Sequence, residues 1–365
     1  MKAKLPLLLS ASLTFGVATH AQGAKTTGTS PAASTDIGKT SNWDALMNQG
    51  RPGDYLGGTV SVAGGALPWD PIPVNVTCDG KIRYTSTTDP KGNFLIAPVK
   101  SDSSVVGNSD TKLAQQFVGC DVQASLPGFD SSSINIANRN VQDNPNLGTI
   151  TLKREDASAG TAVSSTTASA PKDAIKAFDK ARTELLDQKP DKAQKDLEKA
   201  VQIYPQFAEA WFELGKIQEK SKPQDATNSF TKAVGADPKF ILPYQHLAPL
   251  AGQAGKWQEV VDYTSHELEL NPRGTPQTWY YNALANFKLG KADVAETSAN
   301  KALAMDPLHT APNTEQLLAV LLAGRGDSAG ALQHLRNSLT YVPPGPNADL
   351  IKQQIAQLET AIPSK

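Results

Sequence analysis

The sequence predicts a multidomain protein with an all-β front half and an all-α back half. Its 365 residues correspond to roughly two domains. Of the 12 Glu residues, 11 lie after residue 172, and Glu favours helices and is depleted from strands. Short stretches that alternate apolar and polar residues precede residue 155, whereas the back half carries a regular spacing of prolines. These three observations assign a different fold class to each half.

The overall composition excludes several classes of protein. A content of 39% hydrophobic residues with a mean hydropathy of -0.35 allows packed cores but not several membrane spans. The net charge of -1 argues against a nucleic-acid binder, because no basic excess exists to neutralise phosphates. Two cysteines alone cannot build a zinc ribbon or an iron–sulfur site.

The first 21 residues have the order of a secretory signal. Lys2 and Lys4 precede an apolar run at 5–17, and small residues follow it. We expect cleavage after Ala21, a secreted or periplasmic location, and an oxidising compartment that permits a disulfide. Residues 22–52 show little periodicity and are expected to be a flexible lead-in.

Residues 53–155 are predicted to form an all-β sandwich of about seven strands. Apolar side chains alternate with polar ones over short stretches, which indicates half-buried strands. Asp79-Gly80, between two such stretches, is a hairpin signal. The alternating positions include Val60, Val62, Val74, Val76, Cys78, Phe94, Ile96, Val118, Cys120, Val122, Ala124, Ile134, Ile136, Ile150 and Leu152. This pattern predicts an antiparallel sandwich.

The two cysteines both fall on predicted core faces of this region. Cys78 shares its face with Val74 and Val76, and Cys120 shares its face with Val122. A Cys78–Cys120 disulfide is favoured because of the export signal, and two buried free thiols are the alternative.

This stretch resembles the carboxypeptidase regulatory-like domain, a small transthyretin-like β-sandwich. The matching pieces are Gly58-Thr59-Val60, Pro73-Val74-Asn75-Val76, Thr88-Asp89-Pro90-Lys91-Gly92-Asn93-Phe94, Ala124-Ser125-Leu126-Pro127-Gly128-Phe129 and Leu147-Gly148-Thr149-Ile150. The resemblance implies an accessory module without an active site. The polar segment 101–116 departs from a compact sandwich and is either a solvated insertion or a binding loop. A Ser/Thr/Ala-rich flexible linker is expected at 156–171.

The back half contains an internal repeat. Prolines recur at steps of 33 to 36 residues, at Pro205, Pro238, Pro272, Pro307 and Pro343. Twelve residues before each proline stand Ala193, Ala226, Val260, Ala295 and Ala331. Such small residues let two helices approach closely, and the prolines end the second helix of each pair.

This spacing resembles the tetratricopeptide repeat (TPR), a helix–turn–helix unit of about 34 residues. We expect five repeats at 172–343, then a capping helix and tail at 344–365. The resemblance implies an all-α TPR superhelix whose concave face binds peptides or proteins. The candidate groove residues are Phe212, Lys216, Gln245, Tyr280, Leu284 and Phe287. Tyr280 and Phe287 are the expected apolar anchors, with burial between repeats as their alternative role.

No catalytic motif, cofactor-binding motif or metal-binding motif occurs in the sequence. The favoured hypothesis is a non-catalytic exported scaffold that binds protein or peptide partners, with no nucleic acid and no membrane span. One alternative is an envelope- or carbohydrate-binding protein that uses Trp69 and Tyr84 of the front sandwich. Another is an accessory subunit of an enzyme.

Overall fold

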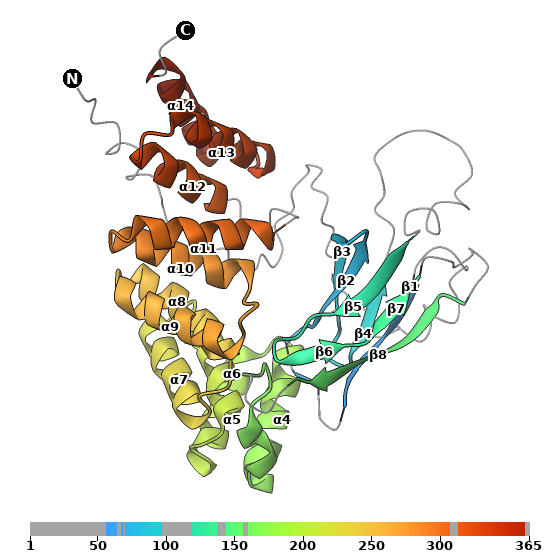
Figure 1. Ribbon diagram of the computed structural model, residues 1–365. Helices are drawn as coiled ribbons and strands as arrows, with labels where there is room; N and C mark the ends of the chain where they lie inside the picture. Colours follow the sequence, from blue (N-terminus) through green and yellow to red (C-terminus); the bar gives the residue numbers. More distant parts are fainter. Residues whose placement is uncertain are drawn as a thin grey trace. The chain divides into compact units, whose positions relative to one another are not determined.

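The computed structural model describes residues 56–63, 67–68, 70–96, 119–136, 144–155, 160–306 and 313–361. The chain divides into two compact units, with the boundary between Val163 and Ser164. Figure 1 shows strands in the first unit and helices in the second. The predicted leader at 1–21, the lead-in at 22–52, Trp69 and the segment 101–116 lie outside the described residues.

The first unit is β-rich and holds two four-stranded sheets within its described residues. The strands are β1 (Leu56–Val62), β2 (Pro73–Cys78), β3 (Lys81–Thr87), β4 (Asn93–Ile96), β5 (Cys120–Ala124), β6 (Phe129–Ser131), β7 (Ser133–Asn135) and β8 (Asn146–Arg154). One sheet has the order β4-β1-β8-β6, and the other has the order β3-β2-β5-β7.

The alternation of apolar and polar residues in the sequence places apolar side chains on a buried face of each sheet. Val74, Val76 and Val122 are fully buried on β2 and β5, as are Phe94 and Ile150 in the other sheet. Strands β2 and β3 pair antiparallel around the turn at residues 79–80, so the hairpin prediction is confirmed.

Cys78 and Cys120 stand directly opposite each other in the antiparallel pairing of β2 with β5. The structure joins them by a disulfide, with Cα atoms 4.1 Å apart. Both cysteines are buried, which agrees with their predicted place on the core faces of their strands.

One strand pairing differs from the antiparallel arrangement that we expected. Strands β1 and β8 run parallel, with Val60 opposite Ile150 and Val62 opposite Leu152. These strands lie at the two ends of the β-rich region, so no tight turn dictates their relative direction. Strand β6 was not predicted, because its three residues are too short for an alternating pattern.

The second unit is all-helical in its described residues. Its α-helices are α4 (Lys172–Leu186), α5 (Pro190–Ile203), α6 (Ala208–Gln218), α7 (Pro223–Ala236), α8 (Leu242–Gln253), α9 (Trp257–Leu270), α10 (Pro276–Lys288), α11 (Ala292–Ala304), α12 (Asn313–Gly324), α13 (Ser328–Tyr341) and α14 (Pro346–Ala361). Consecutive helices pack as five hairpins, α4–α5 through α12–α13, and α14 packs on α13 (Figure 1).

The repeated small residues lie between the helices, as the sequence pattern predicts. Ala193, Ala226, Val260, Ala295 and Ala331 are all fully buried. Gly255, Gly290 and Gly326 connect the two helices of the last three hairpins with φ values of 72°, 77° and 90°, a backbone region that favours glycine. The repeat period therefore appears in the structure as a regular stack of helical hairpins.

Helix α14 packs against the last hairpin of the stack. Its Ala348, Ile351 and Leu358 are buried in one core cluster with residues of α12 and α13. None of the described helices combines the length and the apolar character needed to cross a membrane.

Part of the segment that we expected to be a flexible linker is ordered. In the first unit, the Ala162 N–H donates to the carbonyl of Pro127 at 3.2 Å. In the second unit, a short 3-10 helix, η3 (Ser165–Ser169), precedes α4. The Ser164 hydroxyl donates to Asp237 at 2.7 Å. The sequence does not reveal this order, because these partners lie far apart in the chain.

Candidate partner-binding surface

The first helices of the hairpins, α6, α8 and α10, carry the six residues predicted to line a groove. These residues do not share one environment. Phe212 and Leu284 are each 3% exposed, so a partner cannot reach them in this structure. Lys216, Gln245, Tyr280 and Phe287 are half-buried.

Phe212 belongs to the core between α6 and α8 and not to a groove. Its ring lies 5.8 Å from that of Phe230 and 5.2 Å from that of Phe240. Leu284 likewise lies in a core cluster with Leu317 and Leu318 of α12. The prediction that Phe212 and Leu284 line the groove is wrong, because the neighbouring helix covers both side chains.

Lys216 and Gln245 are held by polar neighbours. The Lys216 ammonium lies 3.1 Å from the carboxylate of Glu213. The Gln245 side-chain amide donates to Glu267 at 2.8 Å. Both side chains therefore already have partners inside the helical unit.

Tyr280 and Phe287 remain as the apolar pair of the predicted surface. They are seven residues apart on α10, which places them two turns apart on one side of the helix. Both pack against the core cluster formed by α10, α11 and α12 while keeping part of their surface exposed. Burial raises the pKa of the Tyr280 hydroxyl above its usual range, so this group stays protonated.

A contact between α6 and α8 was not predicted from the sequence. The His246 ring nitrogen Nδ1 lies 3.1 Å from both carboxylate oxygens of Glu219. The same ring stacks on Phe230 with centroids 4.9 Å apart. A polar pair that joins consecutive repeats has no local sequence signal, because its partners are 27 residues apart.

Buried polar side chains occupy the interface of α8, α9 and α10. Glu267 is 1% exposed and accepts hydrogen bonds from Gln245 and from the Thr278 hydroxyl, the latter at 2.7 Å. Burial raises the pKa of Glu267 to about 7. A neighbouring network joins Thr264, Asn282, Asn286 and Ser298.

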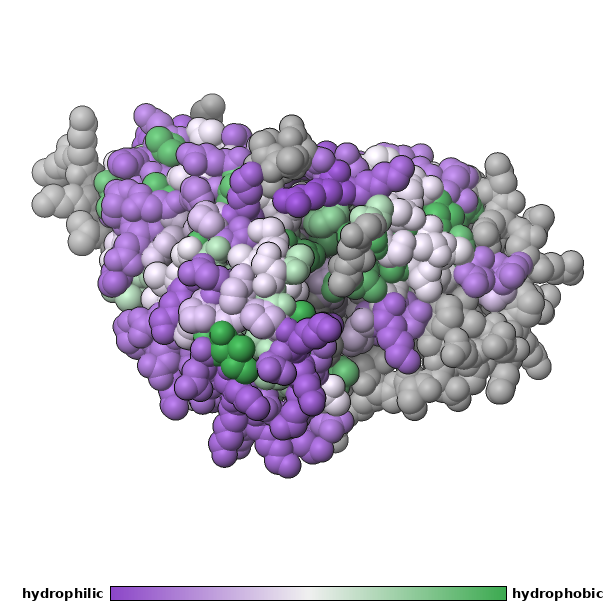
Figure 2. Space-filling model, turned by 90° about the horizontal axis from the view of Figure 1, so that it is seen from below, coloured by the Kyte–Doolittle hydropathy of each residue, from purple (hydrophilic) through white to green (hydrophobic). Residues whose placement is uncertain are grey.

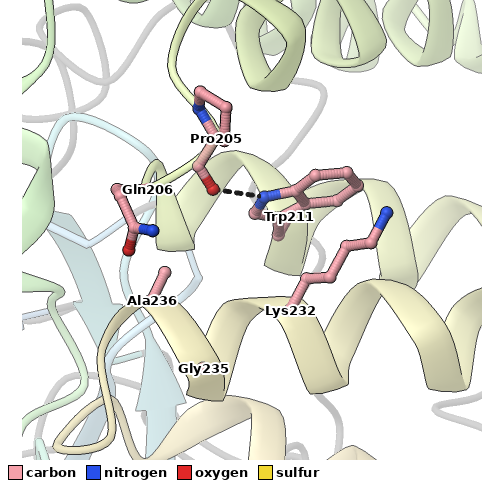
Figure 3. Close-up of a pocket in the computed structure, with 6 residues that line it drawn as sticks. All are labelled: Pro205, Gln206, Trp211, Lys232, Gly235 and Ala236. Atoms are coloured by element: carbon pink, nitrogen blue, oxygen red, sulfur yellow. Dashed lines mark hydrogen bonds between the residues drawn. The ribbon is translucent and has the colours of Figure 1, made fainter.

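A small pocket lies between α6 and α7 (Figure 3). It has a volume of about 410 Å³ and is lined by Pro205, Gln206, Trp211, Lys232, Gly235 and Ala236. The Trp211 indole donates to the Pro205 carbonyl at 2.9 Å, and the Lys232 ammonium lies 4.1 Å from the indole ring.

The same arrangement recurs two hairpins further along the array, on α10 and α11. The Trp279 indole donates to the Arg273 carbonyl at 3.1 Å, and the Lys301 ammonium lies 4.2 Å from that ring. A feature that repeats with the hairpins is part of their packing, so we do not assign the pocket a ligand.

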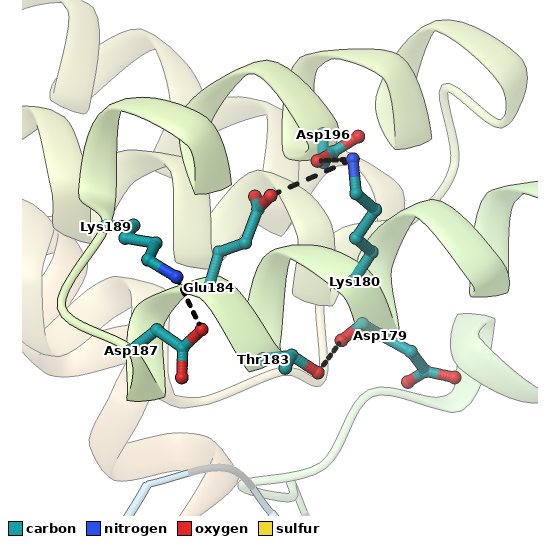
Figure 4. A network of polar contacts seen from close by, with 7 residues as sticks. All are labelled: Asp179, Lys180, Thr183, Glu184, Asp187, Lys189 and Asp196. Atoms are coloured by element: carbon teal, nitrogen blue, oxygen red, sulfur yellow. Dashed lines mark hydrogen bonds and ion pairs between the residues drawn. The ribbon is translucent and has the colours of Figure 1, made fainter.

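Ion pairs join the two helices of the first hairpin, α4 and α5, at its surface (Figure 4). The Lys180 ammonium lies 2.8 Å from Asp196 and 3.8 Å from Glu184, and it joins α4 to α5. The hydrogen bond from Lys180 lowers the pKa of Asp196. Such exposed pairs contribute little to stability and do not define a binding site.

The described residues contain no group of three or more potential metal ligands. Figure 2 shows one face of the molecule, on which hydrophilic residues cover most of the coloured surface and hydrophobic residues gather in smaller patches.

Comparison with known proteins gives partial matches. No family model matches the chain. The tetratricopeptide repeat and J domain-containing co-chaperone DNJ1 of Fusarium oxysporum f. sp. lycopersici is 24% identical over 199 residues. This alignment covers 52% of the present chain and 38% of DNJ1, so the chain matches well under half the length of that relative.

Solved structures also resemble about half of the chain. MamA is similar with 19% identity and a TM-score of 0.40, covering 48% of this chain and 96% of MamA. YrrB, described as a TPR protein with an unusual peptide-binding site, is similar with 19% identity and a TM-score of 0.45, covering 50% of this chain and 92% of YrrB.

The C-terminal unit is an all-helical array of the tetratricopeptide type. Its own features carry this assignment: the 33- to 36-residue step, the helical hairpins and the buried small residues at matching positions. The resemblance of the β-rich region to the carboxypeptidase regulatory-like domain stays a prediction.

Proposed function

We propose that this chain is a non-catalytic exported scaffold that binds protein or peptide partners through its helical array. The observation that carries the proposal is the pair Tyr280 and Phe287, two half-buried aromatic side chains on one side of α10. Aromatic residues set in a well-packed surface are the usual anchors of protein interfaces. The side of α10 that they occupy is the proposed groove surface.

Export is supported by two features of the chain. The first is the order of charges and apolar residues at 1–21, and the second is the disulfide between Cys78 and Cys120, a bond that persists in oxidising compartments. For the β-rich region we propose an accessory sandwich, supported by buried side chains on strands of both sheets, such as Val76 and Ile150.

The groove surface is tested by panning a random peptide library against the full chain. Selected peptides are then measured by fluorescence anisotropy against the wild type and a Tyr280→Ala/Phe287→Ala variant. We expect the variant to lose about tenfold or more in affinity, because truncating anchor residues typically costs more than about 1 kcal/mol each.

The matched control is Leu186→Ala/Tyr341→Ala, which removes two apolar side chains that are 57% and 47% exposed elsewhere on the array. It should bind the peptides as the wild type does. Thermal unfolding of each variant shows whether the array is intact. Equal affinity of the wild type and a folded Tyr280→Ala/Phe287→Ala variant would remove the groove surface from consideration.

A further inference from the structure

The helical unit binds a short segment of its own chain immediately before α4. Residues 164–166 contact α6 and the connection between α7 and α8. The Ser164 N–H donates to Glu209 Oε1 at 3.1 Å. The Ala208 N–H, at the start of α6, donates to the Thr166 hydroxyl at 3.1 Å. The segment is therefore held through both its backbone and its side chains.

Asp237 makes the densest set of contacts with this segment. A single carboxylate oxygen accepts from the Ser164 hydroxyl at 2.7 Å, from the Ser165 N–H at 2.8 Å and from the Ser165 hydroxyl at 3.0 Å. Asp237 is only 6% exposed. A buried carboxylate needs such donors, because removing one leaves its charge less well compensated.

These contacts use backbone N–H groups and hydroxyls of the segment, which a separate peptide of the same sequence would also carry. Two carboxylates take backbone N–H groups, and the hydroxyls of two consecutive serines and a threonine complete the set. Ala170 adds an apolar contact with the core of the first hairpin. Alanine at 164, 165 and 166 would remove every side-chain hydrogen bond from the segment to Asp237 and Ala208.

We propose that residues 164–166 are an internal ligand of the helical unit, and that Ala208, Glu209 and Asp237 form a binding site for peptides that enter a short 3-10 turn and carry consecutive hydroxyl residues. The linker occupies this site, and a hydroxyl-rich segment of a partner competes with it. The site is separate from the groove surface, because Tyr280 and Phe287 both lie on α10. It goes beyond the proposed function and does not depend on it.

The test uses the full chain and a fluorescent peptide with the sequence of residues 160–170, GTAVSSTTASA. In the wild type, the tethered segment competes at an effective concentration on the order of millimolar. A Ser164→Ala/Ser165→Ala/Thr166→Ala variant weakens this competitor. We expect the peptide to bind the variant about tenfold or more tightly than it binds the wild type, as measured by anisotropy.

Two controls isolate the site. The peptide GTAVAAATASA, which lacks the three hydroxyls, should not bind the variant. Adding Asp237→Asn to the variant should weaken binding of the original peptide about tenfold or more, because the carboxylate accepts three hydrogen bonds in the internal complex. Adding Tyr280→Ala/Phe287→Ala instead should leave this binding unchanged, which separates this site from the groove surface.

Circular dichroism establishes that each variant is folded. Should the triple variant lose helical signal, Ser165→Ala alone is expected to raise peptide affinity in the same direction by a smaller factor. Three results would each overturn the proposal. The peptide could bind the wild type and the folded variant with equal affinity, or the two peptides could bind the variant equally. The third is no binding up to about 1 mM, which is the expected effective concentration.

Discussion

At the scale of single residues, Glu267 departs most clearly from the repeat pattern. The equivalent positions in the other hairpins hold Ala200, Ala233, Ala302 and Ser338, all fully buried. Glu267 is buried as well and has neutral hydrogen-bond donors, Gln245 and Thr278. Its burial disfavours the ionised carboxylate, which is why its pKa is raised.

The raised pKa of Glu267 makes stability depend on pH in a defined direction. The ordinary pKa is 4.5 and the folded value is about 7. As the pH rises from 4.5 to 7, the unfolded chain ionises this group while the folded chain keeps it protonated, so stability falls. We expect Glu267→Gln to be more stable than the wild type at pH 8, by about 1–3 kcal/mol, and no different at pH 4.

Urea unfolding at the two pH values measures this difference. The matched control is Glu269→Gln on the same helix, because the Glu269 side chain is 76% exposed and its replacement should change stability little at either pH. A stabilisation by Glu267→Gln that is equal at pH 4 and pH 8 would contradict the assigned cause.

At the scale of elements, close approach of α6 and α7 requires Gly215. A Cβ atom at this position would lie 2.6 Å from the Phe230 ring. We expect Gly215→Ala to lower the free energy of unfolding by about 1–3 kcal/mol, because the overpacked ring must move. Gly235 on α7 is the matched control, because a Cβ atom there meets nothing within 4 Å.

Gly235→Ala should raise the free energy of unfolding by up to about 1 kcal/mol through helix propensity. Urea denaturation monitored by circular dichroism at 222 nm compares the two variants. If both substitutions destabilise the protein by a similar amount, overlap with the Phe230 ring is not the cause of the loss at Gly215.

The pairing of β2 with β5 carries the disulfide. The disulfide closes a loop between two cysteines that are 42 residues apart in the sequence. The loss of this closure is expected to destabilise the β-rich unit by about 2–4 kcal/mol. Dithiothreitol should therefore lower the unfolding midpoint of the wild type, and a Cys78→Ser/Cys120→Ser variant should start lower and not respond to the reductant.

Thiol labelling of the denatured, non-reduced protein provides an independent measurement. We expect no labelled thiol in the wild type and two after reduction. Two labelled thiols without reduction would show that the cysteines are free.

At the scale of the whole molecule, helix α14 packs on the last hairpin of the array. Ile351 and Leu358 of α14 are 0% and 1% exposed, and they cover the last hairpin. We expect Ile351→Ala/Leu358→Ala to lower the free energy of unfolding of the array by about 2–5 kcal/mol for each substitution. The same helix offers a control, Gln353→Ala/Gln357→Ala, at two exposed positions.

The control pair should stay within about 0.5 kcal/mol per site of the wild type. Chemical unfolding of the full chain followed by circular dichroism measures both. An array that unfolds identically with and without the two buried side chains would show that α14 is not a cap.

The sequence predicted much of the fold because its signals are local. Strand alternation placed Val74, Val76 and the two cysteines on buried faces, and the proline step located the helical hairpins. The direction of β1 relative to β8 was not predictable, because no turn connects them. The division of the groove candidates was not predictable either: Phe212 and Tyr280 both directly follow the matching tryptophans Trp211 and Trp279, and only Tyr280 keeps exposed surface.

The sequence by itself determined a β-rich region, a tetratricopeptide-type array and a pair of cysteines positioned to meet. The tertiary structure alone decided that Phe212 and Leu284 are core residues, that Glu267 is buried among neutral donors, and that residues 164–166 dock on Glu209 and Asp237. The physical reason is the distance along the chain between the residues that interact. Periodicity reports which residues share a face of one helix or strand, whereas these contacts join segments up to 73 residues apart.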